Sequence, residues 1–76
     1  MFERIRDLVA DKLGVEPDEI TMETSFADDL LADSITLFEL IMTIEDEFDI
    51  EVDDESIEQI NTIGDIVNYL EEIINS

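Results

Sequence analysis

Ser34 is the residue of this sequence whose type and position could best support chemistry. It follows Asp33 directly and stands at the expected start of a helix, where a hydroxyl group is exposed and can be reached by an enzyme. The 76-residue chain has no His and no Cys, so it offers neither a His-assisted nucleophile nor a thiolate metal site. Ser34 therefore has no general base to activate it, and a reaction at its hydroxyl needs an external enzyme. Taken alone, the Asp-Ser pair is also compatible with a plain capping serine.

Carboxylate chemistry is the next candidate, because 23 residues are acidic. The acid-rich segment that begins at Asp49 could suggest calcium, but an EF-hand loop needs Gly at its sixth position and Glu at its twelfth, and here these are Asp54 and Ile60. We predict no specific metal site, only weak binding of divalent cations that raises the melting temperature beyond the effect of matched ionic strength. A hydrolase with paired carboxylates is disfavoured, because so many acids form chance pairs and so short a chain has little room for a substrate cleft.

The charge balance excludes several classes of partner. With 3 basic residues against 23 acidic ones the net charge is −20, and the only cations are Arg4, Arg6 and Lys12. Nucleic acid and anionic membranes would be repelled. Because 45% of the residues are hydrophobic and regularly spaced, we expect a folded chain rather than a disordered one. No apolar run exceeds three residues, so we predict no membrane span and no signal peptide, and expect a cytoplasmic monomer with one domain over residues 1–76.

Apolar residues recur at helical spacing in three long segments. These predict helices over residues 2–13, 34–48 and from residue 63 to near the C-terminus, with a shorter helix over 54–60. The fold class is therefore all-α: a small antiparallel four-helix bundle with a short third helix and a long loop between the first two helices.

Local signals place the ends of these helices. Gly14 follows the first helix as a residue suited to the left-handed region, and Asp33 or Ser34 is the predicted N-cap of the second. Thr62 and Asp65 have the spacing of a capping box, with Asp in place of the usual Glu. Residues 17–19 suggest one helical turn, and residues 49–53 a loop.

The second helix carries two apolar faces. One of them is the expected core face, formed by Leu37, Leu40, Ile41, Ile44 and Phe48. On the opposite side, Ile35, Phe38 and Met42 alternate with acids, which are Glu39, Glu45 and Asp46. This second stripe either packs on the long loop or another helix, or forms a docking surface for a partner with a basic patch.

The run from Phe26 to Val52 closely resembles acyl carrier proteins. The likeness centres on the triplet Asp33-Ser34-Ile35, the following Glu39-Leu40-Ile41-Met42, and a tail with Glu45, Phe48, Ile50 and Val52 at matching spacing. Three positions depart from the family pattern: Leu31 stands where Gly is usual, Thr36 where Asp is common, and Val52-Asp53 where many members have Ile-Pro.

The resemblance implies a carrier that is not an enzyme. Ser34 would bear a 4′-phosphopantetheine arm, moved from coenzyme A by a phosphopantetheinyl transferase, and the arm would hold acyl chains as thioesters for fatty-acid synthesis enzymes with basic docking patches. The residues implied in recognition by the transferase and other partners are Asp33, Ile35, Phe38, Glu39, Met42, Glu45 and Asp46. Those implied in an acyl-chain pocket are Phe26, Leu40, Ile44, Ile57 and Ile60. A carrier of a polyketide or D-alanine pathway, and an unmodified acidic interaction module, remain as alternatives.

Overall fold

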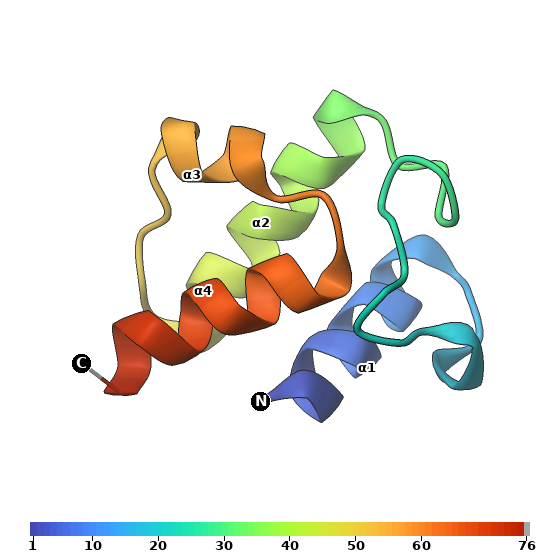
Figure 1. Cartoon of the computed structure of the whole chain (residues 1–76), viewed down its shortest axis with the longest axis horizontal. Coiled ribbons are helices and arrows are strands. Elements are labelled where there is room, and N and C mark those ends of the chain that lie inside the picture. Colours follow the sequence, from blue (N-terminus) through green and yellow to red (C-terminus); the bar gives the residue numbers. More distant parts are fainter. Residues whose placement is uncertain (76) are drawn as a thin grey trace.

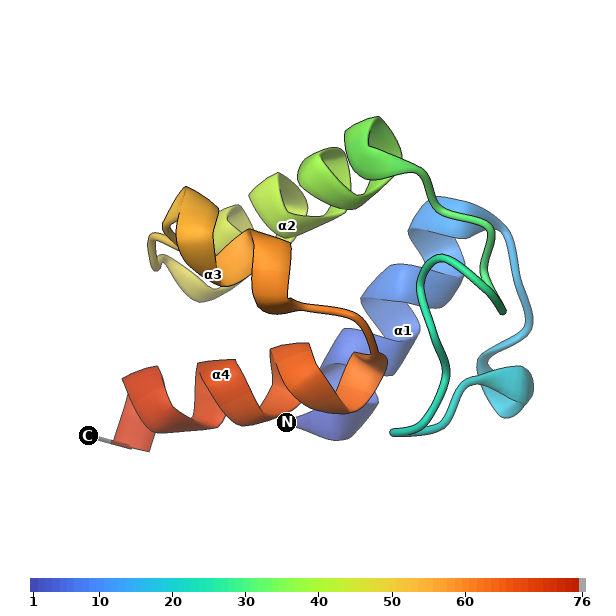
Figure 2. The same ribbon diagram turned by 45° about the horizontal axis from the view of Figure 1, so that its top comes forward.

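Four α-helices make up the molecule, as the computed structural model shows for residues 1–75 (Figure 1). They are α1 (Phe2–Leu13), α2 (Ser34–Phe48), α3 (Asp54–Gln59) and α4 (Ile63–Asn75), and a single 3-10 turn, η1 (Pro17–Glu19), lies in the long α1–α2 connection. The turned view shows the short α3 between α2 and α4 (Figure 2). The predicted all-α bundle is confirmed, and α3 ends one residue earlier than the sequence indicated.

The helix-end signals predicted at Gly14 and Thr62 are confirmed, and Asp53 adds a cap that was not predicted. Gly14 ends α1 in the left-handed region with φ of 69°, a conformation that costs glycine little. Asp53 caps α3, because its Oδ1 accepts a hydrogen bond from the Ser56 N–H at 2.7 Å. At the start of α4 the capping box is reciprocal: Thr62 Oγ1 accepts from the Asp65 N–H at 3.2 Å, and Asp65 Oδ2 accepts from the Thr62 N–H at 3.1 Å.

One hydrophobic core joins the three long helices. Each contributes side chains that are fully buried, such as Ile5 of α1, Leu40 of α2 and Leu70 of α4. Helix α1 packs against both α2 and α4. Removing a side chain of this size from water stabilises the fold by roughly 1.5–3 kcal/mol, so a few such residues decide whether so small a chain folds.

The long loop is fixed to the α3–α4 connection by backbone hydrogen bonds. The Phe26 N–H donates to the Asn61 carbonyl at 2.9 Å, and the Gly64 N–H donates to the Met22 carbonyl at 2.8 Å. A Cβ at position 64 would lie 2.8 Å from that same Met22 oxygen, so only glycine fits this approach. These contacts hold the Phe26 ring in the core, where it is 2% exposed.

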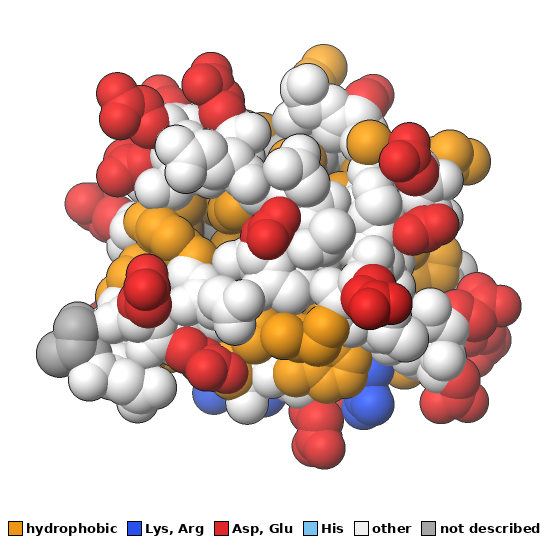
Figure 3. All heavy atoms as spheres, in the orientation of Figure 1, with side chains coloured by type: hydrophobic (Ala, Val, Ile, Leu, Met, Phe, Trp, Pro, Cys, Tyr) orange, Lys and Arg blue, Asp and Glu red, His pale blue; other side chains and the backbone are white. Residues whose placement is uncertain are grey.

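The two arginines of α1 pair with acids of the same chain. Arg4 Nη2 pairs with Glu47 Oε1 at 3.0 Å and its guanidinium lies 4.6 Å from the centre of the Phe48 ring, while Arg6 pairs with Asp7 at 3.1 Å. Exposed pairs of this kind add little stability. The charge is unevenly distributed: basic side chains gather at the lower edge of the visible face, and acidic ones stand over the rest of it (Figure 3).

Within residues 1–75, none of the helices is both long enough and apolar enough to cross a membrane.

Candidate functional site

Ser34 is the first residue of α2, and its side chain is exposed. The cap of this helix is Asp33, whose Oδ1 accepts a hydrogen bond from the Thr36 N–H at 2.8 Å. Among the residues that the structure describes, none forms a hydrogen bond with the Ser34 hydroxyl. The capping role is therefore already filled, and the Ser34 hydroxyl is free to react.

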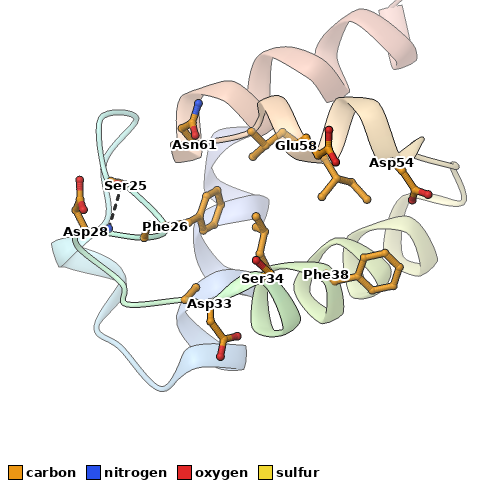
Figure 4. A pocket seen from close by; sticks show the side chains of 14 residues that line it. Ser25, Phe26, Asp28, Asp33, Ser34, Phe38, Asp54, Glu58 and Asn61 are labelled. Carbon is orange, nitrogen blue, oxygen red and sulfur yellow. Dashed lines mark hydrogen bonds between the residues drawn. The ribbon is translucent and has the colours of Figure 1, made fainter.

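Asp33 places a fixed negative charge beside that hydroxyl. The hydrogen bonds that it accepts from Thr36, first of all from the backbone N–H, hold the pKa of the Asp33 carboxyl below its usual value. In the close-up the carboxyl group points away from the hollow that Ser34 borders (Figure 4). The start of a helix favours a nearby anion by roughly 0.3–1 kcal/mol, but here Asp33 already uses one of the free N–H groups. A phosphodiester on Ser34 would have to share this helix end with the carboxylate.

A cavity of about 870 Å³ opens next to Ser34. It lies between the end of the long loop, the first turns of α2, and the segment from α3 to Asn61 (Figure 4). Its apolar wall is formed by Phe26, Ala32, Leu37, Phe38, Ile57 and Ile60. Its polar rim is formed by Ser25, Asp28, Asp33, Asp54, Glu58 and Asn61. A hydrophobic chain attached near Ser34 could therefore be buried in this cavity without displacing side chains of the hydrophobic core.

The wall of this cavity differs in part from the set expected from sequence. Phe26, Ile57 and Ile60 line it, whereas Leu40 and Ile44 are fully buried in the core and do not. Sequence reasoning did not assign Ala27, Ala32, Leu37 or Phe38 to this cavity. Leu37 lies three residues after Ser34 and so faces the same side of the helix, a signal that could have found it.

The second apolar stripe of α2 is open to solvent. Ile35 is 71% exposed, Phe38 47% and Met42 50%, so neither the loop nor another helix covers this stripe, although Phe38 also borders the cavity. Leu31, at the end of the loop, is more exposed still at 82%. Exposed apolar side chains therefore stand on both sides of Ser34 along the chain, Leu31 before it and Ile35 after it.

The acids of this face fall into two kinds. Glu39 and Asp46 are exposed. Glu45 is half-buried, and its Oε2 accepts a hydrogen bond from the Val52 N–H at 2.7 Å. Glu45 therefore holds the α2–α3 connection, a role that its helical position does not reveal.

Carboxylates do not gather into a metal site: within residues 1–75, no group of three or more acids is placed to hold an ion. In the segment that could have suggested calcium, Asp49 ends α2 with φ of 54° and Asp53 caps α3.

Comparison with known proteins identifies the family. Residues 3–70 match the family described as phosphopantetheine attachment site. An acyl carrier protein of Clostridium acetobutylicum is 53% identical over 70 residues, which cover 92% of this chain and 91% of the relative. The chain belongs to the acyl carrier protein family. A relative in Clostridium perfringens is 50% identical over 72 residues, 95% of each chain.

Solved structures of acyl carrier proteins share the fold. One from Mycobacterium tuberculosis superposes with a TM-score of 0.81 at 35% identity, covering 90% of this chain and 92% of the other. One from Enterococcus faecalis gives a TM-score of 0.75 at 35% identity, covering 90% and 86%. Acyl carrier proteins are carriers rather than enzymes, and their cofactor is 4′-phosphopantetheine. The residues present fit that group, because an exposed, uncommitted hydroxyl stands beside a cavity that can take an apolar chain.

Proposed function

We propose that Ser34 is the attachment residue of the phosphopantetheine arm. The observation that carries this proposal is the combination at the start of α2: Asp33 caps the helix, and the exposed Ser34 hydroxyl has no hydrogen-bonding partner within residues 1–75. When bound, the arm supplies a thiol that holds an acyl chain as a thioester. The chain itself has no His, so the proton of the Ser34 hydroxyl goes to a base of the transferase that installs the arm.

The cavity beside Ser34 is proposed to shelter the first carbons of the acyl chain. Phe26, Ile57 and Ile60 form its wall together with Ala32 and Leu37. Each methylene that leaves water contributes about 0.8 kcal/mol. Leu40 and Ile44 act on this cavity only through the core that supports it, because both are fully buried.

The exposed face of α2 is proposed to dock the partner enzymes. Ile35, Phe38 and Met42 offer apolar contacts, and Asp33, Glu39 and Asp46 offer charges for basic residues of the partner. Opposite charges of this kind raise the rate of encounter more than the final affinity. Met42 suits a surface that meets several partners, since its side chain adapts to different shapes.

The pathway we propose is fatty-acid synthesis in the cytoplasm, by a carrier that is a single domain and a monomer. A chain with a net charge of −20 suits partners that present basic patches. The same charge supports weak, diffuse binding of divalent cations, without a fixed site.

Loading assays distinguish this pathway from D-alanine transfer. The modified carrier is offered malonyl-coenzyme A with a malonyl transferase, or D-alanine and ATP with a D-alanine ligase, followed in the first case by a ketoacyl synthase. We expect a malonyl thioester and a condensation product, and no D-alanyl thioester. Loading with D-alanine alone would assign the chain to that pathway. A modified chain that accepts neither group, while one control carrier of each pathway accepts its own group, would belong to another carrier pathway.

A further inference from the structure

Leu31 adopts a backbone conformation that leucine rarely takes. Its φ is 54°, in the left-handed region, where the Cβ crowds the following carbonyl oxygen. A bulky residue at positive φ is an outlier. At 82% exposure the side chain packs against almost nothing that could compensate for this strain.

The backbone at Leu31 is set by its neighbours. On one side the Leu30 N–H donates to the Ser25 carbonyl at 3.1 Å, and on the other the Ala32 N–H donates to the Phe26 carbonyl at 2.8 Å. The chain between these two bonds has to turn through the left-handed region, which glycine or asparagine does at lower cost. The leucine side chain therefore brings no benefit to the fold, and strain of this kind at a surface position points to a function.

The position of Leu31 shows what kind of function this is. It lies two residues before the cap Asp33 and three before Ser34, so it stands on the loop side of the hydroxyl while Ile35 stands on the helix side. Two exposed carboxylates, Asp29 and Asp33, lie two residues before and two residues after it in the chain. In the space-filling view, hydrophobic side chains protrude between acidic ones around the start of α2 (Figure 3).

We propose that Leu31 is a specificity-determining contact for the transferase that modifies Ser34. This inference rests on the proposed function. The transfer takes place at the Ser34 hydroxyl itself, so the enzyme must enclose the end of the loop and the first turn of α2. An enzyme that works on the acyl group meets it at the far end of a long arm. The surface that fits is an apolar recess for Leu31, rimmed by Lys or Arg that face Asp29 and Asp33.

Steady-state kinetics test this with a bacterial phosphopantetheinyl transferase, coenzyme A and Mg²⁺. Leu31→Asn keeps the left-handed backbone but removes the apolar chain, and Leu31→Met keeps an apolar chain. We expect Leu31→Asn to raise the KM for the carrier about 5- to 30-fold with little change in kcat. The reason is that the leucine side chain, which the enzyme would bury in the complex, is lost. Leu31→Met should have the same KM as wild type. Ile74→Asn, which removes an exposed isoleucine from α4, is the matched control and should have no effect.

A melting curve separates this role from a structural one. Leu31→Gly should melt no lower than wild type, because the strain is relieved, and yet be a poorer substrate of the transferase. An unchanged KM for Leu31→Asn, with wild type modified normally, would overturn the proposal and leave the function of Ser34 standing. Normal modification combined with weakened binding to a ketoacyl synthase would assign Leu31 to that enzyme and equally overturn it. Failure to modify wild type, with the transferase active on a control carrier, would overturn the proposed function itself.

Discussion

The Asp33 carboxylate caps α2 through the Thr36 N–H, with Oδ1 2.8 Å from the nitrogen. Because of this bond, Asp33 and Ser34 have separate roles. Asp33 fixes where the helix begins, and Ser34 is left exposed as its first residue with a free hydroxyl. A serine that had to cap the helix could not be modified without loss of the cap.

The cap gives a prediction on pH. The folded-state pKa of Asp33 lies below the usual 3.8, so the cap stabilises the fold fully above that value and is lost as the pH falls through the lowered pKa. Wild type should therefore be more stable than Asp33→Ala at pH 7, and the difference should shrink below about pH 4. Urea unfolding at pH 7, 5 and 3 measures it. Protonation of the other carboxylates at low pH relieves their mutual repulsion in both proteins alike, so this effect cancels in the difference.

Asp33→Asn is the control for that experiment, because asparagine caps helices without a charge. Its difference from Asp33→Ala should not depend on the titration of residue 33. A gap between wild type and Asp33→Ala that stays constant down to pH 3 would show that the charge of this carboxylate plays no part in the cap.

Replacing Glu45 should lower the stability of the fold, whereas replacing Glu39 should not. Glu45→Ala removes the acceptor of the Val52 N–H, a bond of 2.7 Å at a half-buried site, and should cost about 1–2 kcal/mol in the free energy of unfolding. Glu39→Ala, on the same helix but exposed, should change it by less than about 0.5 kcal/mol. Glu45→Gln keeps an oxygen acceptor and should recover much of the loss. Equal stabilities for the two alanine variants would show that the Glu45 bond contributes nothing.

Gly64 should not tolerate a side chain. Replacing glycine by alanine inside a helix is usually favourable by up to about 1 kcal/mol. Here the new Cβ would lie 2.8 Å from the Met22 carbonyl oxygen, so Gly64→Ala should destabilise the protein by about 1–3 kcal/mol. Asn68→Ala, at an exposed position of α4, serves as the control. Chemical denaturation compares the two, and a stabilised Gly64→Ala would mean that the loop yields freely at this contact.

The cavity wall can be tested by filling it. Ile57→Phe places a larger side chain in the wall, so it reduces the volume of the cavity that borders Ser34, and it should leave attachment of the arm unchanged. Loading an eight-carbon acyl chain should raise the melting temperature of wild type, because the chain leaves water, and should raise that of Ile57→Phe less. Ile57→Val, which leaves the cavity open, should behave as wild type. Identical acyl-dependent shifts in all three proteins would place the chain elsewhere.

Much of the fold could be predicted from the sequence because its signals are local. The helical spacing of apolar residues fixed the bounds of α1 and α2, and short-range cap signals at Gly14, Asp33 and Thr62 placed helix ends. Spacing also revealed the second apolar stripe of α2, but it left open whether the stripe packs on the loop or another helix or faces solvent, and the structure decides this.

The remaining features depend on contacts between distant segments. The left-handed turn at Leu31 arises where the loop is tied down next to Phe26, which is itself bonded to Asn61. The bond from Val52 to Glu45 depends on how the chain folds back after α2. Of the core-facing residues of α2, the position of the loop decides that Leu37 borders the cavity and Leu40 does not.

Intact mass after incubation with coenzyme A, Mg²⁺ and a phosphopantetheinyl transferase tests the central claim most directly. Wild type, Ser34→Ala and Ser25→Ala are compared, the last removing a second serine at the same cavity. We predict a gain of one phosphopantetheine on wild type and on Ser25→Ala, none on Ser34→Ala, and fragment ions that place the group on Ser34. A gain that persists in Ser34→Ala, or no gain on wild type while a control carrier is modified, would contradict the assignment of Ser34.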